Sequence, residues 1–446
     1  MTARLRTMLT DLADDIEIVD RSGSAARAWA GARLLRRRQR RLRVAGAGAV
    51  VAALAVAVPL GLSRVQTPRI DLPATTPTPS SVTRSGQPAP LVVGGVTVDQ
   101  LPAATLASLT SLVVEADGAP LPTALAVERD DVVPALAGGV GTAGRVGAVL
   151  VRDLGADRFH PVFFVGGSIG GFVEATRVTL TPFGSPVNGK RMVLGAHIVA
   201  PDGYRVGFVQ DGSVIFVDIR DGSVRQVSIP TDHLESGGWS AAGTWFIAHS
   251  ESRTWRIDPA GPTVQPAAED VHEGHHLVAS DGTTVHLARY DDSGTPVSRR
   301  EVSPLLGSSW ADSVTSPGGL VATGCFTAPD ISSAVNGFQG MSFVGFDEDG
   351  SFERPRAVVL TGLLDAPKGA FSALRWVSED VVLYRLAGDD AVRLMAWDIV
   401  QGRNWFVADL PRTDLGYRFA LGVGLQATTE RPRSTPDNSG GSSATT

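Results

Sequence analysis

Residues 200–224 read APDGYRVGFVQDGSVIFVDIRDGSV. The two runs YRVGFV and SVIFVDI are rich in the β-branched and aromatic residues that favour strands. Pro, Asp and Gly lie between them, and Asp-Gly pairs favour tight turns because they tolerate left-handed backbone angles. This stretch therefore predicts short strands separated by tight turns.

The same unit recurs along the chain. Glycines 203, 243, 282 and 319 each lie in a turn that precedes a strand-like run, and they are 40, 39 and 37 residues apart. A fifth turn at residues 375–380 precedes VVLYRL, and its larger offset indicates an insertion near residues 325–340. A period of about 40 residues with a late turn in each unit is typical of a four-stranded propeller blade.

We therefore predict an all-β domain over residues 91–426. Five units come from the repeat, and the strand-like runs of residues 91–195 hold two more, less regular blades. The predicted fold is a six- or seven-bladed β-propeller. It is preceded by short α-helices and one transmembrane helix.

A basic block precedes the longest uncharged run. The block holds seven arginines between Arg33 and Arg43, and the run Val44–Ser63 has twenty residues without a charge. About 20 apolar residues cross a bilayer as a helix, and basic flanks stay in the cytoplasm. We predict one span at 44–63, an uncleaved signal anchor. The N-terminus is then cytoplasmic, with the arginines on lipid headgroups, and the C-terminal domain is extracytoplasmic.

Three further segments complete the predicted organisation. Residues 1–43 form a cytoplasmic helical segment, where Leu5, Met8, Leu9 and Leu12 share one helical face. This segment is too short for its own core, so we expect it to lie on lipid or to dock on a cytoplasmic protein. Residues 64–90 are a disordered Pro/Thr-rich stalk, and residues 427–446 are a disordered polar tail.

Charge and cysteine content exclude several classes. The net charge is −6, while residues 1–43 carry eleven Arg and five acidic residues, so the remainder is acidic. We assign the basic block to membrane topology and expect no nucleic-acid partner. Cys325 is the single cysteine, so an intramolecular disulfide and a cysteine-based metal site are both excluded.

His272-Glu273-Gly274-His275-His276 matches the H-E-x-x-H pattern of zinc proteases. That chemistry needs a helix, which sets two histidines one turn apart. Here a glycine interrupts the motif, and a propeller turn follows at residue 282. We predict a solvated loop between two blades and no metal centre. The alternative is adventitious metal binding by His272, His275 and His276.

No other stretch carries a catalytic pattern. The chain has no G-x-S-x-G elbow, and the run Gly166–Gly171 lacks the Lys-Ser/Thr of a phosphate-binding loop, which favours a hairpin. Six tryptophans recur near the predicted turns, where they either pack between blades or form a sugar-binding platform. We predict no catalytic residue, no cofactor and no enzyme activity.

Two resemblances add to this interpretation. The unit Pro201-Asp202-Gly203 followed by Tyr204-Arg205-Val206 resembles the repeats of WD40-like and TolB-type propellers. LRTMLTDLADD at residues 5–15 and GARLLRRRQRRLR at residues 31–43, followed by the span and the stalk, resemble actinobacterial single-pass membrane proteins. Some of those proteins are thought to be anti-sigma factors. The resemblance implies that the N-terminal segment binds a cytoplasmic partner such as a sigma factor.

The function expected from the sequence is therefore that of a membrane-anchored sensor, regulator or binding protein. In this interpretation the propeller is the scaffold for an unknown extracytoplasmic ligand or protein. The alternative is a cell-envelope interaction module in which the N-terminal helices serve only as an anchor. A propeller-based hydrolase is the third alternative.

Overall fold

The computed structural model describes most of the chain from residue 87 to residue 431. The described ranges are 87–93, 96–141, 144–184, 191–231, 233–268, 270–273, 276–280, 285–302, 309–315, 321–326, 339–346, 352–361, 371–388, 391–410 and 418–431. They all belong to the second of two compact units, residues 76–446. The predicted segments 1–43 and 44–63 and most of the predicted stalk lie outside them. In the described part of the chain we find no helix with both the length and the apolar character that a membrane span requires.

The described residues form six β-sheets and one short 3-10 helix, η1 (Ala103–Ser108). We number the sheets 1 to 6 along the chain. Sheet 1 contains β5 (Val146–Gly155), β6 (Arg158–Val165), β7 (Gly171–Glu174) and β26 (Phe419–Leu421). Sheet 2 contains β8 (Arg205–Gln210), β9 (Ser213–Asp218) and β10 (Ser223–Ser228). Sheet 3 contains β11 (Leu234–Trp239), β12 (Phe246–Ser250), β13 (Thr254–Ile257) and β14 (Val264–Ala267).

The remaining three sheets complete the second unit. Sheet 4 contains β15 (His276–Ser280), β16 (Val285–Tyr290) and β17 (Pro296–Val302). Sheet 5 contains β18 (Ser309–Thr315), β19 (Val321–Phe326), β20 (Gln339–Phe346) and β21 (Phe352–Thr361), with β2 (Val96–Pro102) and β1 (Leu91–Val93) at its edge. Sheet 6 contains β22 (Phe371–Trp376), β23 (Val381–Ala387), β24 (Val392–Asp398) and β25 (Arg403–Leu410), with β3 (Ser111–Ala116), β27 (Leu425–Arg431) and β4 (Ala119–Pro120).

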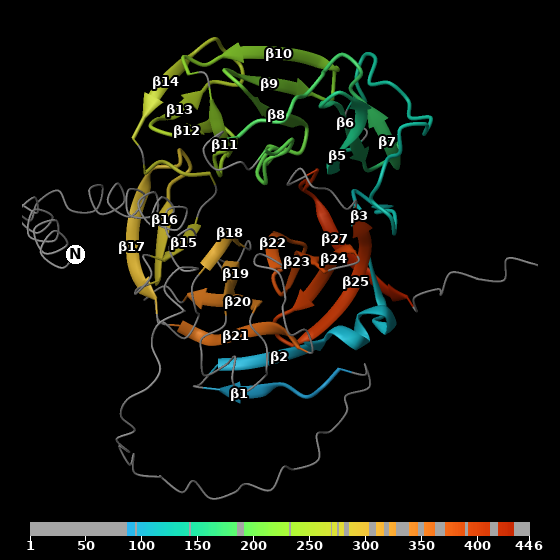
Figure 1. Ribbon diagram of the computed structural model, residues 1–446, viewed down its shortest axis with the longest axis vertical. Coiled ribbons are helices and arrows are strands. Elements are labelled where there is room, and N and C mark those ends of the chain that lie inside the picture. The colour runs from blue at the N-terminus through green and yellow to red at the C-terminus, as the bar shows by residue number, and fades with distance from the viewer. Residues whose placement is uncertain are drawn as a thin grey trace, which may run out of the picture. The chain divides into compact units, whose positions relative to one another are not determined.

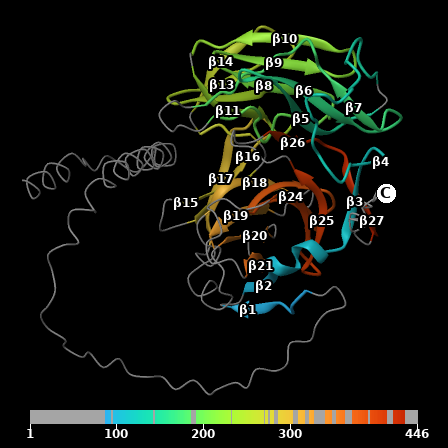
Figure 2. The ribbon, with the colours of Figure 1, turned by 45° about the vertical axis from the view of Figure 1, so that its right-hand side comes forward.

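The six sheets follow one another round a common centre (Figures 1 and 2). The end strands of neighbouring sheets contact each other: β8 contacts β11, β15 contacts β18, β18 contacts β22, and β22 contacts β26. Strands that are consecutive in the chain and share a sheet pair antiparallel. The all-β part of the predicted fold is confirmed.

The repeat seen in the sequence corresponds to one position in successive sheets. The turn that holds Gly203 immediately precedes β8, and the turn that holds Gly243 precedes β12. Both glycines have positive φ angles, +79° and +68°, which strain any residue with a Cβ atom. In the first turn the Asp202 carboxylate accepts the backbone N–H of Tyr204 at 2.9 Å, as Asx turns do. The turns at 281–284 and 316–320 lie outside the described residues.

Residues 91–195 differ from the prediction, because they contribute one sheet and not two. β1 and β2 join sheet 5, where β2 runs parallel to β21 from Thr97–Arg356 to Pro102–Thr361. β3 and β4 join sheet 6. The free edge of a meander offers unpaired backbone groups, and these early strands satisfy them. The described residues therefore hold six sheets.

Both predicted boundaries of the β domain also shift. Gln87 was expected in the stalk, yet it is buried, and its side chain donates to the Asn404 carbonyl oxygen at 2.9 Å. Residues 427–431 were expected in the tail, yet they belong to β27, which pairs with β3. Nothing in the local composition reveals these pairings, since they depend on partners about 300 residues away.

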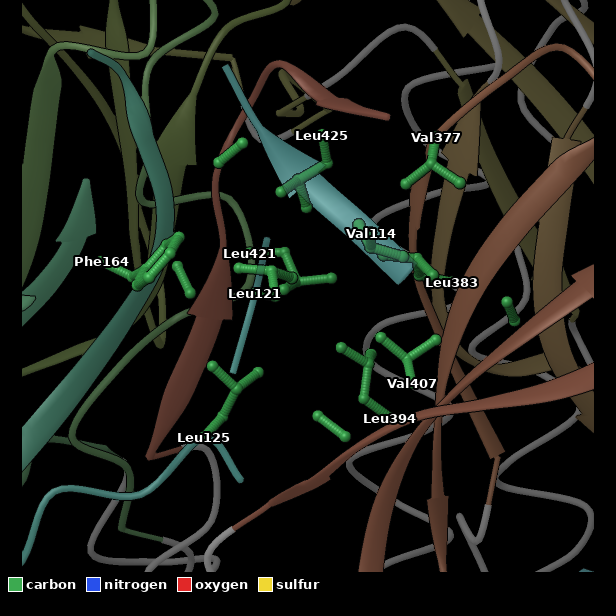
Figure 3. Packing of buried hydrophobic residues seen from close by; sticks show 14 of the residues in the cluster. Val114, Leu121, Leu125, Phe164, Val377, Leu383, Leu394, Val407, Leu421 and Leu425 are labelled. Atoms are coloured by element: carbon green, nitrogen blue, oxygen red, sulfur yellow. The ribbon is translucent and has the colours of Figure 1, made fainter. Parts of the chain in front are cut away.

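The core consists of apolar layers between neighbouring sheets. In the layer between sheets 1 and 6, Phe164 and Leu421 face Leu383, Leu394 and Val407 (Figure 3). Five of the six repeat-associated tryptophans are buried: Trp239, Trp255, Trp376, Trp397 and Trp405. Their burial agrees with the predicted role in packing.

Candidate functional site

A cavity of about 460 Å³ lies between sheets 2 and 3. Its walls come from β9, β10 and the turn between them, from the end of β11, and from the turn between β13 and β14. Cavities of this size commonly hold small ligands. The apolar layer beneath it contains Phe216 and Trp239, whose ring centroids are 5.6 Å apart.

Arg225 on β10 reaches across the boundary between the two sheets. Its Nη2 donates to the backbone carbonyl oxygen of Asp258 at 2.7 Å and to that of Gly261. Its guanidinium lies over the ring of Phe216, 5.8 Å from the centroid. Its Nε atom is buried and has no hydrogen-bond partner in the part of the chain that the structure describes. No carboxylate of the described residues forms an ion pair with this arginine.

Arg205 on β8 also lines the cavity. Its Nε donates to Asp202 at 2.7 Å and its Nη2 to the Gly243 carbonyl oxygen at 3.2 Å. The guanidinium lies 4.8 Å from the centroid of the Trp239 ring, within cation–π distance. Burial acts to raise the pKa of Asp202, but its hydrogen bonds from Tyr204 and Arg205 outweigh burial and lower it.

The rim of the cavity carries a third arginine. Arg220 pairs with Asp218 through two hydrogen bonds, and this pairing raises the pKa of the Arg220 guanidinium above its ordinary value. Three guanidinium groups and two carboxylates therefore line the cavity, and each carboxylate is paired with an arginine. The net charge is positive by one and is centred on Arg225.

A second polar cluster surrounds Glu273, in the connection between β14 and β15. The Glu273 carboxylate lies 3.2 Å from Nε2 of His249 and 3.6 Å from Nε2 of His272. His249 also bonds the Thr254 hydroxyl through Nδ1 at 3.1 Å. Burial alone would raise the pKa of Glu273, but the charge and hydrogen bond of His249 and the charges of two further histidines hold it well below 4.5.

The fourth member of this cluster is His197, which precedes β8. A methyl group added to Gly238 on β11 would lie 2.6 Å from His197 Cβ and 3.2 Å from Glu273 Cγ. Residues from three consecutive sheets or their connections thus meet at one point. Because Glu273 is only 8 % exposed, the cluster has the character of an internal contact.

The H-E-x-x-H prediction is therefore partly corrected. Residues 270–273 are a loop, as predicted, but His272 and Glu273 are largely buried and not solvated. His275 lies outside the described residues, and His276 begins β15, where only its backbone is described. Among the described side chains, no group of three or more His, Cys, Asp or Glu is placed to hold a metal ion. The Gly166–Gly171 run is the turn between β6 and β7, as predicted.

The cavity was not found from the sequence. Arg205, Arg220 and Arg225 all fall in the repeat unit that begins at residue 200, and this clustering is the only signal that they give. The residues that complete the cavity, Trp239, Pro259 and Ala260, belong to sheet 3 or its turns. Only the packing of sheet 2 on sheet 3 brings the two sets together.

Comparison with known proteins yields similarity of fold alone. No family model matches the chain, and no curated protein matches it. A protein described as TolB from Agrobacterium tumefaciens is 13% identical, with 64% of this chain and 100% of that one covered, at a TM-score of 0.33. The β-propeller domain of Cps50 (Swd1) from Myceliophteria thermophila is 12% identical, with coverage of 58% and 84% and a TM-score of 0.31. Hydrazine synthase from Kuenenia stuttgartiensis is 16% identical, with coverage of 50% and 68% and a TM-score of 0.30.

Proposed function

We propose that the β domain is a six-bladed propeller that binds a ligand, and that the chain is a membrane-anchored sensor, regulator or binding protein without catalytic activity. Six sheets round a common centre support the propeller assignment (Figure 1). Completion of sheet 1 by the C-terminal strand β26 supports it as well, because this pairing joins the two ends of the ring.

The cavity between sheets 2 and 3 is the observation that carries the binding function. It combines a volume suited to a small molecule with Arg225, which forms no ion pair with a carboxylate of the described residues. Polar groups with fixed positions in a concave site give specificity to small-molecule binding. Arg205 and Arg225 are fixed in this way by hydrogen bonds to backbone carbonyl oxygens of sheet 3 or its turns.

Thermal unfolding in the presence of a chemically mixed compound library tests this function. We expect at least one class of compound to raise the melting temperature of the purified full-length chain, because ligands that bind only the folded state stabilise it. A variant that fills the cavity, Ala260→Trp, should lose this response. Stabilisation that persists in Ala260→Trp would place ligand binding elsewhere.

The sensor role requires a partner on the other side of the membrane. In our proposal residues 1–43 bind a cytoplasmic protein such as a sigma factor, and residues 44–63 span the bilayer. Affinity purification of the full-length chain, beside a chain that lacks residues 2–32, tests this role. Specific recovery of one cytoplasmic protein by the full-length chain alone is the expected result. Equal recovery by both chains would leave the N-terminal segment as an anchor.

A further inference from the structure

We propose that the cavity between sheets 2 and 3 takes a small organic monocarboxylate, with Arg225 as the residue that binds its carboxylate group. This inference rests on the proposed ligand-binding function and adds the chemical class of the ligand.

The side chains that line the cavity carry one more positive charge than negative charges. Arg205 and Arg220 each pair with a neighbouring aspartate, Asp202 and Asp218 respectively. Arg225 is left without an anionic partner among the described residues, and its guanidinium stays charged at all physiological pH values. Charged groups held away from solvent are stable when they are paired. A ligand with one negative charge supplies the missing partner.

Hydrogen bonds hold the guanidinium of Arg225 in place and leave some of its donors for a ligand. A guanidinium carries five N–H donors, and the two on Nη2 are used by the carbonyl oxygens of Asp258 and Gly261. The donors on Nε and Nη1 have no acceptor among the described residues. The Nε–H lies on the same edge of the guanidinium as Nη2 and is buried, so the N–H groups of Nη1 are the donors that remain for a ligand. A charge-assisted hydrogen bond from Nη1 can hold one oxygen of a carboxylate. Because Nη2 and the Phe216 ring already hold the group, binding costs little side-chain entropy.

The two aspartates of the cavity favour a singly charged carboxylate over a doubly charged phosphate. Asp202 and Asp218 line the same cavity as Arg225. A doubly charged anion would leave one negative charge without a partner beside these carboxylates, whereas a monoanion balances the cavity. The wall also includes Val217, Pro259 and Ala260, which offer apolar contacts to the body of the ligand.

Calorimetric titration of the full-length chain with matched acid and amide pairs tests the proposal. The pairs are benzoate and benzamide, hexanoate and hexanamide, and N-acetylphenylalanine and its primary amide, with inorganic phosphate as a further probe. Each pair differs in charge at nearly constant shape. We expect at least one acid to bind about tenfold or more tightly than its amide, the usual effect of a charged hydrogen bond.

Three variants test whether Arg225 is the residue that binds the carboxylate. Arg225→Gln removes the charge, and we expect it to abolish the preference for the acid. Arg256→Gln is the control, because Arg256 also links two sheets through hydrogen bonds to Ser293 and Thr295 but lies outside the cavity. We expect Arg256→Gln to keep the preference. Arg225→Lys retains the charge but loses the rigid guanidinium that hydrogen bonds to Asp258 and Gly261 hold in place, so it should bind the acid with intermediate affinity.

The outcomes separate the ligand class from the proposed function. Amides that bind as tightly as their acids, or phosphate that binds more tightly than every acid, would overturn the monocarboxylate class while a binding cavity stands. An acid preference that survives in Arg225→Gln would overturn the role of Arg225. If no probe binds while other compounds of the mixed library do, only the ligand class fails. If no compound of any class binds, both proposals fail.

Discussion

The H-E-x-x-H motif gives its glutamate a catalytic role in zinc proteases, whereas Glu273 makes buried contacts with histidines in this fold. Among the histidines, His249 on β12 has the largest effect on its pKa, followed by the motif neighbour His272 and then by His197, which precedes β8. Its pKa is below the ordinary value of 4.5, so ionisation of Glu273 is more favourable in the folded chain than in the unfolded one. The carboxylate therefore stabilises the folded state at every pH at which it is ionised in both the folded and the unfolded chain.

A pH-dependent stability measurement checks this role. The contribution of Glu273 should be complete above about pH 4.5 and decrease as the pH falls toward the lower pKa of the folded state. Near pH 6 we expect Glu273→Gln to lower the free energy of unfolding by about 3 kcal/mol, and at pH 3 by much less. Urea unfolding at both pH values measures the difference. Glu251→Gln, at an exposed position, is the control, and an equal effect of Glu273→Gln at both pH values would contradict the account.

Arg375 on β22 presents the opposite situation, a largely buried cation with no ion-pair partner among the described residues. It follows the irregular pairing between β22 and β23. Burial, together with the nearby charge of Arg145, lowers the pKa of Arg375 from 12.5 to about 10. A lowered pKa in a base means that its charged form destabilises the folded state.

Removal of this charge should therefore stabilise the domain. We expect Arg375→Met, which keeps most of the length of the side chain, to raise the free energy of unfolding by about 1–2 kcal/mol. The same replacement at the exposed Arg253 should change it by less than about 0.5 kcal/mol. Chemical unfolding of the two variants beside the parent chain provides the comparison. A less stable Arg375→Met protein would show that this guanidinium has a partner in solution.

Among the secondary-structure elements, β2 has the least expected position. It pairs parallel with β21, from which it is separated by about 250 residues. Asp99 on β2 is 3 % exposed and accepts hydrogen bonds from Arg356 on β21, at 2.7 and 2.8 Å, and from Trp397 on β24, at 2.9 Å. This buried pair fixes the early strand on sheet 5.

Loss of the Asp99 charge should loosen this strand before the rest of the domain. We expect Asp99→Asn to destabilise the domain by about 3 kcal/mol, because it leaves Arg356 buried without its counterion. Hydrogen exchange should accelerate most at residues 96–102 and 352–361. Exchange that rises equally in all six sheets would contradict a local role for β2.

The C-terminal strands complete two sheets, so their removal has a larger predicted effect. Truncation after residue 417 deletes β26 and β27 and leaves one edge of β5 and one edge of β3 unpaired. We expect this chain to lose cooperative unfolding, as a ring without its closing strand exposes apolar edges. Truncation after residue 431 should leave the melting temperature unchanged. If the shorter chain unfolds as cooperatively as the longer one, closure by β26 is not required.

These elements show which parts of the fold a sequence reveals. The turn before β8 and the turn before β12 follow local rules, since Asp202 and Gly203 need particular backbone angles whatever surrounds them. β2 and β27 obey no local rule for pairing, because the choice of partner depends on which distant edge is free. The sequence therefore predicts the strands and the repeat, and it misassigns the sheets to which residues 91–116 belong.

The residues of the candidate site also divide into those that a local sequence pattern reveals and those that only long-range packing brings together. His272 and Glu273 were singled out because they are adjacent in a known motif, whereas Arg225 gave no motif at all. Its importance depends on Asp258 and Gly261, whose carbonyl oxygens it reaches only after sheets 2 and 3 pack together. A cavity between repeats is a property of two units, and a pattern within one unit cannot reveal it.

At the scale of the whole molecule, the six sheets of the described residues lie round a common centre (Figure 1), and apolar clusters join sheets 6 and 1, sheets 1 and 2, and sheets 2 and 3. Such a scaffold can present a site at the boundary of two sheets without disturbing the others. We propose the ligand site at the boundary of sheets 2 and 3, whereas the buried contact of Glu273 with histidines involves residues of sheets 2, 3 and 4 or their connections. The first is expected to respond to ligand and the second to pH.

Hydrogen exchange with and without a stabilising carboxylate tests the central claim most directly. We predict protection concentrated at residues 216–225 and 258–261, which form the cavity, with little change at residues 270–273 or in sheet 6. Protection centred on any other sheet, or none at saturating ligand, would contradict the assignment of the ligand site.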